Sequence, residues 1–234
     1  FEYIYFARPD SLINGKCAYE YRKKLGAELA RETDIKADLV VPVPDSGVPA
    51  ALGYALESEK NFELGLIRNH YVGRTFIEPT QNIRSLGVKL KLSSTKTIVK
   101  NKSVVLIDDS LVRGTTCHKI VKMLYESGAK EVHVRIACPE IKFPDFYGVD
   151  MPTKEELLAY KKSNQEMCQY INAKSLSFLS IDGLYKALTD QKRNDQYPQF
   201  SDHYFTGDYP IKPSDSLQGL KIKQLSLLSV KSNN

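Results

Sequence analysis

The sequence feature that most constrains the fold is an apolar run at residues 104–107 that leads directly into two adjacent carboxylates, Asp108 and Asp109. An unbroken apolar run of this length, rich in Val, is typical of a strand buried on both faces of a parallel sheet. A second apolar run follows at 132–137, after a glycine at 128. The residues between have the i, i+3, i+4 and i+7 apolar spacing of a helix at Cys117, Ile120, Val121 and Leu124. The stretch therefore predicts a strand, helix, strand unit, and with it an α/β protein built on a parallel sheet.

The loop between this strand and its helix, residues 110–116, predicts a ligand site. In open α/β sheets, ligands bind just outside the carboxyl ends of the strands, where loops lead into helix N-termini. Backbone N–H groups at such an end hold phosphate, assisted by the helix dipole. Asp108 and Asp109 would then accept hydrogen bonds from sugar hydroxyls or help to hold Mg²⁺. We expect a phosphorylated sugar to bind here.

The same arrangement recurs earlier in the chain. Residues 38–44 predict a short buried strand, and Pro42 indicates an edge strand or a strand end. Asp45, Ser46 and Gly47 follow, and then a helix whose apolar positions are Val48, Ala51, Leu52, Ala55 and Leu56. An Asp-Ser pair here is also an ordinary helix N-cap. Beside the Asp-Asp loop, a second anion-binding loop that faces the same crevice is favoured.

The other elements follow from the same kinds of pattern. The aromatic and β-branched residues 1–7 predict a strand that begins abruptly, as though other chain preceded it. Further expected elements are helices over 16–32, 153–159, 164–171 and 181–188, and a strand over 176–179. From residue 190 the sequence turns polar, so we expect a domain at 1–189 and, at 190–234, a tail that packs on it or is partly disordered.

Residues 68–100 form an irregular basic segment, with seven Lys or Arg against a single acidic residue, Glu78. Such a segment inside a compact domain indicates a flexible lid or binding loop. Nucleic-acid binding is disfavoured, because the charges are not in runs and aromatic residues do not alternate with them. A lid that closes on a polyanionic ligand fits better than a solvated surface loop.

Composition sets the outer bounds. With 234 residues, 42% hydrophobic and 26% charged, the chain is expected to be a soluble globular protein with one large domain. No apolar run is long enough to span a bilayer, and the net charge of +5 suits small anions as well as nucleic acid. The cysteines are far apart and form no C-x-x-C, which argues against disulfides and zinc and favours the cytoplasm; they are Cys17, Cys117, Cys138 and Cys168.

Residues 104–116 resemble the phosphoribosyl pyrophosphate (PRPP) motif of the type I phosphoribosyltransferases. Further blocks narrow the resemblance to the glutamine PRPP amidotransferase family, and they lie at 1–11, 43–46, 71–77, 87–93 and 176–180. The resemblance implies an open, mostly parallel sheet with helices on both faces, a flexible basic lid and a small hood or tail.

The resemblance also implies an activity. Ammonia would displace pyrophosphate from PRPP to give 5-phosphoribosylamine, the committed step of purine nucleotide synthesis. In the family an N-terminal glutaminase domain, with a cysteine nucleophile at its mature N-terminus, supplies the ammonia. Residue 1 here is Phe, so we expect the phosphoribosyltransferase half alone, dependent on free ammonia. Purine nucleotides are implied as feedback inhibitors, and a homodimer or homotetramer as the assembly.

Cofactors follow from the same resemblance. Mg²⁺ is implied, with Ser46, Asp108 and Asp109 nearby. Some family members hold an iron–sulfur cluster through four cysteines. Here Asp145 stands at one expected cysteine position and residues 197–207 contain no cysteine, so no cluster is expected.

Roles for the site residues can be assigned from these two sources. The 5-phosphate would bind Ser110, Leu111, Val112, Arg113, Gly114, Thr115 and Thr116. The ribose hydroxyls would bind Asp108 and Asp109, and the pyrophosphate Asp45, Ser46, Gly47 and Val48. Arg74, Lys89 and Lys91 are the candidates for closing over the pyrophosphate as catalytic residues.

Two alternatives stay open. A non-enzymatic PRPP or nucleotide sensor would keep the Asp-Asp loop, although the basic lid argues against it. A salvage phosphoribosyltransferase for a free base is possible within the superfamily, although residues 71–93 disfavour it. A phosphorelay receiver is rejected, because its carboxylate pair belongs at the first strand rather than in mid-chain.

Overall fold

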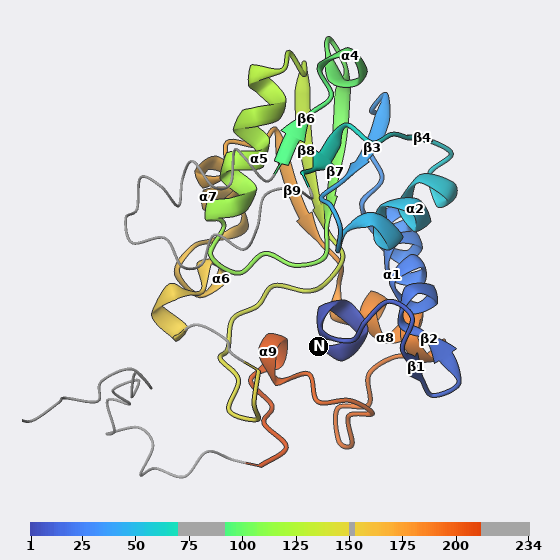
Figure 1. The fold of residues 1–234 in the computed structure, drawn as a ribbon. Helices are drawn as coiled ribbons and strands as arrows, with labels where there is room; N and C mark the ends of the chain where they lie inside the picture. The colour runs from blue at the N-terminus through green and yellow to red at the C-terminus, as the bar shows by residue number, and fades with distance from the viewer. Residues whose placement is uncertain (70–91, 150–152, 212–234) are drawn as a thin grey trace, which may run out of the picture.

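A five-stranded, wholly parallel sheet forms the centre of the protein, with the order β4-β3-β7-β8-β9 (Figure 1). The structure is a computed structural model and describes residues 1–69, 92–149 and 153–211. The strands are β3 (Leu39–Pro42), β4 (Asn61–Phe62), β7 (Ser103–Asp108), β8 (Glu131–Ile136) and β9 (Ser175–Phe178). The predicted α/β fold with an open parallel sheet is confirmed.

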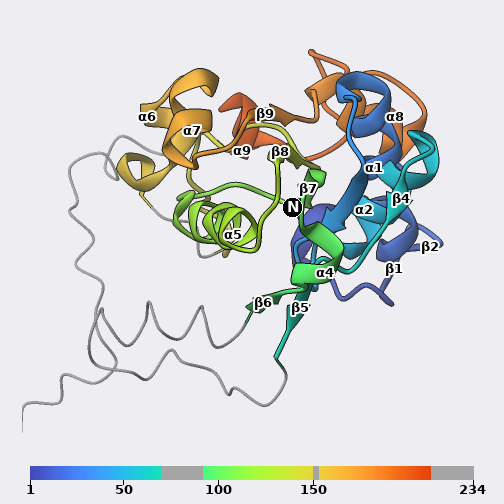
Figure 2. The same ribbon diagram turned by 90° about the horizontal axis from the view of Figure 1, so that it is seen from above.

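Helices cover both faces of this sheet (Figure 2). One face carries α1 (Ala18–Thr33), α2 (Val48–Glu57) and α8 (Ile181–Thr189). The other carries α5 (Thr115–Glu126), α6 (Leu158–Lys161) and α7 (Asn164–Tyr170). None of the helices in the described residues is both long and apolar enough to cross a membrane.

The unit that dominates the sequence lies at the middle of the sheet. Residues 104–107 are fully buried in β7, which pairs in parallel with β3 on one side and β8 on the other. The buried residues of α5 are the four that its spacing predicted: Cys117, Ile120, Val121 and Leu124. Pro42 is the last residue of β3, an interior strand, so it marks a strand end rather than a sheet edge.

Two predicted elements differ in the structure. Residues 1–7 do not form a strand: η1 (Glu2–Phe6) is a π-helical turn, in which the Phe6 and Ala7 amides donate to carbonyls five residues back. A small hairpin, β1 (Leu12–Ile13) with β2 (Lys16–Cys17), precedes α1. The helix predicted over 153–159 is split into a 3₁₀ turn, η3 (Lys154–Glu156), and α6, because Leu157 has extended backbone angles.

The face of α2 also differs from the predicted one. Leu56 is 65% exposed, and the buried residues include Pro49, Ala50, Gly53 and Tyr54. The cause is close contact with α1: a Cβ on Gly53 would lie 1.9 Å from the carbonyl oxygen of Lys23.

Two peripheral parts complete the fold. The strands β5 (Leu66–Arg68) and β6 (Leu92–Ser94) pair antiparallel and are followed by α4 (Lys96–Val99). The segment predicted to be irregular over 68–100 is therefore regular at 92–94 and 96–99, because these residues pair with β5 and bury Val99 in the core. After α8 the chain returns past the N-terminus to α9 (His203–Thr206), where Tyr204 and Phe205 are buried.

Candidate phosphoribosyl site

Two polar loops meet at the carboxyl ends of the neighbouring strands β3 and β7. The amide of Val43 donates to the carbonyl of Ile107 at 2.8 Å, and the amide of Gly47 donates back to Val43 at 2.9 Å. Ser46 lies close enough to the carboxylate of Asp109 to lower its pKa, so a side chain of one loop faces a side chain of the other. The structure thus brings residues 45–48 and 108–116 together at one edge of the sheet.

A cavity of about 440 Å³ opens between the two loops. Its polar wall includes Ser46, Asp108, Asp109 and Ser110. Its apolar wall comes from elsewhere in the chain and includes Phe1, Tyr5, Phe6, Leu92 and Val149. A polar floor beneath an apolar rim suits a ligand with a hydroxylated, charged body.

The two carboxylates at the end of β7 are held in place by hydrogen bonds. Asp109 is only 6% exposed; its amide donates to Asp108 Oδ1 at 2.9 Å, and its carboxylate accepts from Ser110. Burial raises the pKa of Asp108 well above its ordinary value, and the adjacent charge of Asp109 adds to the rise. Burial also raises the pKa of Asp109, although hydrogen bonds from Ser110 and Ser46 and the charge of Arg22 oppose it. Such a pair is stabilised by neutral hydroxyl donors or by a cation.

The loop after the carboxylates encloses a hollow of about 220 Å³, which is lined by Asp108 and by residues 110–117. Gly114, with φ at +75°, turns the chain into α5. Within the described chain, none of the backbone N–H groups of residues 112–116 donates to a protein acceptor. Unpaired amides at a helix N-terminus that border a hollow are the features of an anion site.

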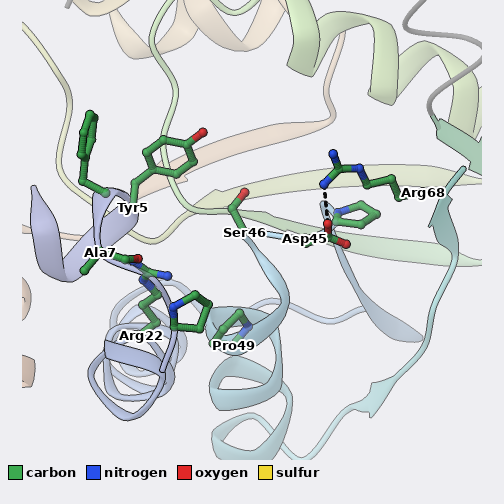
Figure 3. A pocket seen from close by; sticks show the side chains of 10 residues that line it. Tyr5, Ala7, Arg22, Asp45, Ser46, Pro49 and Arg68 are labelled. Carbon is green, nitrogen blue, oxygen red and sulfur yellow. Dashed lines mark hydrogen bonds and ion pairs between the residues drawn. The ribbon is translucent and has the colours of Figure 1, made fainter. Parts of the chain in front are cut away.

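The loop after β3 is more open. Asp45 is 58% exposed and pairs with Arg68 of β5 at 2.5 Å. Beside it lies a cavity of about 470 Å³, with Tyr5 and Arg22 on one side and Asp45 with Arg68 on the other (Figure 3). Gly47 lies against the sheet, and α2 starts at Val48.

Sequence reasoning missed Arg22 and the aromatic residues of η1. Arg22 is 4% exposed, and its guanidinium donates to the carbonyls of Glu2, Tyr3 and Ala7, which holds η1 against the site. The available signal was an arginine three residues before Leu25, on the apolar face of a helix. Arg113 of the phosphate loop points outward and pairs with Glu156 at 3.2 Å. The predicted lid residues Arg74, Lys89 and Lys91 lie outside the described residues.

Metal and cofactor chemistry can be judged from the donors present. No group of three or more His, Cys, Asp or Glu side chains in the described residues is placed to hold a metal. Ser46, Asp108 and Asp109 provide hard oxygens, which fit a Mg²⁺ that also binds substrate phosphates. The carboxylate of Asp145 accepts hydrogen bonds from His203 and two backbone amides, so it does not fit a thiolate-ligated cluster. All four cysteines are free thiols.

Two polar loops that lead into helix N-termini suit a phosphorylated sugar, and comparison with known proteins shows the family of the chain. Residues 18–146 match the phosphoribosyl transferase domain family. The match covers more than half of the chain, and the chain belongs to this family.

The individual proteins that the chain resembles have a more specific name than the family. Amidophosphoribosyltransferase of Rhizobium etli is 57% identical over 230 residues, covering 98% of this chain and 46% of that protein. The Staphylococcus aureus enzyme of the same name is 52% identical over 209 residues, covering 89% of this chain and 42% of that protein. Glutamine PRPP amidotransferase of B. subtilis, solved with ADP and GMP, has a TM-score of 0.83 at 50% identity over 92% of this chain and 47% of that chain. The chain thus spans about half the length of the relatives it matches.

Proposed function

We propose that this chain transfers ammonia to PRPP, which gives 5-phosphoribosylamine and pyrophosphate, the committed step of purine nucleotide synthesis. The observation that carries the proposal is the contact between the two loops: the half-buried Asp108 and the buried Asp109 lie between two helix N-termini, and the amide of Val43 joins the two strand ends by donating to the carbonyl of Ile107. PRPP has the matching order of groups, because its ribose hydroxyls lie between a 5-phosphate and a 1-pyrophosphate. The amidophosphoribosyltransferase relatives support the same reaction.

Each loop then has a role. The free amides of residues 112–116 and the exposed hydroxyls of Thr115 and Thr116 bind the 5-phosphate. Asp108 and Asp109 accept from the 2- and 3-hydroxyls, and residues 45–48 bind the pyrophosphate. Ser46, Asp108 and Asp109 would hold Mg²⁺ together with the substrate phosphates, and the ion would supply positive charge for the leaving pyrophosphate.

The chemistry needs positioning more than a strong base. Loss of pyrophosphate leaves positive charge on the anomeric carbon, and the neutral nitrogen of ammonia attacks it. The candidate lid residues Arg74, Lys89 and Lys91 close over the pyrophosphate and exclude water, which competes for the same carbon. Loss of one such preorganised contact lowers kcat by about 10²–10³-fold.

Several further properties belong to this proposal. Residues 1–189 form the transferase domain, and 190–234 a C-terminal extension. Purine nucleotides act as feedback inhibitors, by analogy with the Bacillus structure that contains ADP and GMP. A glutaminase domain in cis supplies ammonia in the whole protein, which works as a homodimer or homotetramer in the cytoplasm.

The test is release of pyrophosphate from PRPP by the 234-residue chain with Mg²⁺. We expect turnover with ammonium chloride and none with glutamine. Potassium chloride at the same concentration is the control for ionic strength. PRPP binding without turnover would replace this proposal with the sensor, and turnover with a free purine base in place of ammonia would replace it with a salvage enzyme.

A further inference from the structure

The loop that follows β8, residues 137–149, forms part of the wall of the proposed transferase site. Val149 lines the cavity of about 440 Å³ together with Asp108, Asp109 and Thr116. The described part of this loop contains no helix or strand. Cys138 and Ile141 anchor its first half in the core, and contacts from the C-terminal segment 202–211 hold the rest.

Asp145 is the centre of the loop. Its side chain is fully buried, and its Oδ2 accepts from the amides of Tyr147 and Val149, each at 2.8 Å. These two bonds fix the turn that ends at the cavity wall. Burial alone would raise the pKa of Asp145, but the bonds from Val149, Tyr147 and His203 outweigh it and lower that pKa.

His203 of α9 supplies a side-chain donor, and the hydroxyl of Tyr204 also lies close enough to Asp145 to lower its pKa. Its Nε2 donates to Asp145 Oδ1 at 2.8 Å, and its side chain is 1% exposed. Three rings enclose the imidazole: Tyr204 at 4.1 Å, Tyr209 at 4.9 Å and, edge-on, Tyr147 at 5.1 Å between centroids. Its Nδ1 has no hydrogen-bond partner within the described chain. The ring is thus held in one orientation, with Nε2 directed at Asp145.

Other contacts hold the same loop more weakly. The amides of Lys142 and Phe143 donate to the carbonyl of Tyr204 at 2.9 and 3.1 Å. The hydroxyl of Tyr209 donates to the carbonyl of Pro144 at 2.9 Å. These bonds fix the first half of the loop, whereas the His203–Asp145 bond acts on the turn that carries Val149.

We propose that His203 is a positioning residue for phosphoribosyl transfer. Through Asp145 it fixes the turn at 145–149 and so places Val149 against the sugar-binding cavity. His203 and Val149 are more than fifty residues apart in sequence. The effect on catalysis rests on the proposed function above, whereas the effect on the turn does not.

The first experiment compares His203→Leu with His203→Gln. Leu removes the donor and keeps an apolar side chain of moderate size, whereas the Gln amide can donate to Asp145 from nearly the position of Nε2. We expect the KM for PRPP to rise about tenfold in His203→Leu, within the ~10²-fold that an ångström of misplacement can cost. His203→Gln should recover most of the loss. An unchanged KM in a folded His203→Leu overturns the proposal, and so does a failure of His203→Gln to recover the loss. If the Leu variant does not fold, the proposal still requires that His203→Gln has the KM of the wild type.

A matched control separates positioning from general stability. Asp202, next to His203, is 3% exposed and accepts from Tyr185 at 2.8 Å and Arg193 at 2.6 Å, with no contact to Asp145. Asp202→Asn should lower the melting temperature and leave the KM for PRPP unchanged. An equal rise in KM would show that any weakening of this segment has the same effect, against a specific role for His203.

Two further measurements make the test independent. The KM effects of His203→Leu and Val149→Ala should be non-additive in the double variant, because both act on one wall; additive effects count against the proposal. Amide hydrogen exchange at Tyr147 and Val149 needs no turnover and should be at least tenfold faster in His203→Leu. Unchanged exchange overturns the proposal even in an active enzyme. In the remaining case, the wild-type chain fails to turn over PRPP while exchange is still faster in His203→Leu than in the wild type. That pair of results would reject the proposed function and leave the effect of His203 on the turn intact.

Discussion

The two loops of the site share one architecture and differ in electrostatics. Each follows a parallel strand, carries aspartate and serine, and leads into a helix N-terminus. The loop after β7 keeps its carboxylates inside, with Asp109 at 6% exposure, whereas the loop after β3 leaves Asp45 58% exposed and paired with Arg68. Asp108 and Asp109 therefore have raised pKa values, and Asp45 is held in solvent by a partner from another strand.

This difference indicates different tasks. A desolvated carboxylate pair is a costly device, which a protein keeps where a ligand's hydroxyls must be recognised in a fixed place. An exposed aspartate–arginine pair can open when an anion arrives, which frees the arginine to bind that anion. The first loop suits the part of PRPP that stays bound through the reaction, and the second suits the pyrophosphate that leaves. The predictions below test this contrast, from the largest expected effect to the smallest.

The largest expected effect is on activity, in Asp109→Asn. The amide has nearly the same shape but lacks the charge that accepts a ribose hydroxyl, and hydrogen bonds to charged groups are worth about 1.5–3 kcal/mol. We expect kcat/KM for PRPP to fall by about 10- to 100-fold, measured as pyrophosphate release with ammonium. Asp45→Asn is the matched variant on the other loop and should lose clearly less. Equal losses in the two variants would contradict the division of roles.

The next effect is on stability, in Gly47→Ala. A Cβ here would lie 2.6 Å from the carbonyl oxygen of Ile107 and 2.9 Å from that of Val43, and neither backbone atom can move without shifting the sheet. We expect a loss of about 2–3 kcal/mol in the free energy of unfolding, measured by urea titration. Gly114→Ala is the comparison on the other loop. There the new Cβ meets the end of the Leu158 side chain at 2.6 Å, which can rotate, so the cost is mainly that of the left-handed backbone, about 1–2 kcal/mol. The reverse order would show that the loop after β3 is the softer one.

How far the sequence predicts this site depends on the range of the interactions. The unit of β7, its loop and α5 was predictable because its apolar run and helical spacing are local patterns. The π-helical turn η1 was not, since its residues have strand-like composition and the contact that holds it is Arg22, 15 to 20 residues away. The approach of Ser46 to Asp109 needed the knowledge that β3 and β7 are neighbours, which no local pattern contains.

The third prediction uses pH. The folded protein raises the pKa of Asp108, so the folded state binds more protons than the unfolded chain between about pH 4 and that raised value. Stability contributed by this group therefore falls as the pH rises through that window. Asp108→Asn removes the penalty, and we expect it to be more stable than the wild type at pH 7 by about 1 kcal/mol while its activity falls.

The measurement is urea unfolding of both proteins from pH 4 to 8. The difference between their free energies of unfolding should grow with pH. Taking this difference cancels the opposite slopes from carboxylates with lowered pKa values that both proteins share, such as Asp145 and Glu166. A difference that is constant over this range would mean that the ionised carboxylate of Asp108 does not destabilise the folded protein.

The smallest effect is expected where the second loop contacts β5. The Arg68–Asp45 pair joins side chains that are 51% and 58% exposed, so solvent screens it, and pairs of this kind contribute about 0–1 kcal/mol. Arg68→Gln should change the free energy of unfolding by less than about 0.5 kcal/mol, and about 1 M salt should remove even that difference. The gain from Asp108→Asn should survive the same salt, because Asp108 is half-buried beside the buried Asp109 and is screened less. If both differences vanish in salt, the two loops have the same electrostatic character. If only the Arg68 difference vanishes, Arg68 can leave Asp45 and bind pyrophosphate at little cost to the fold.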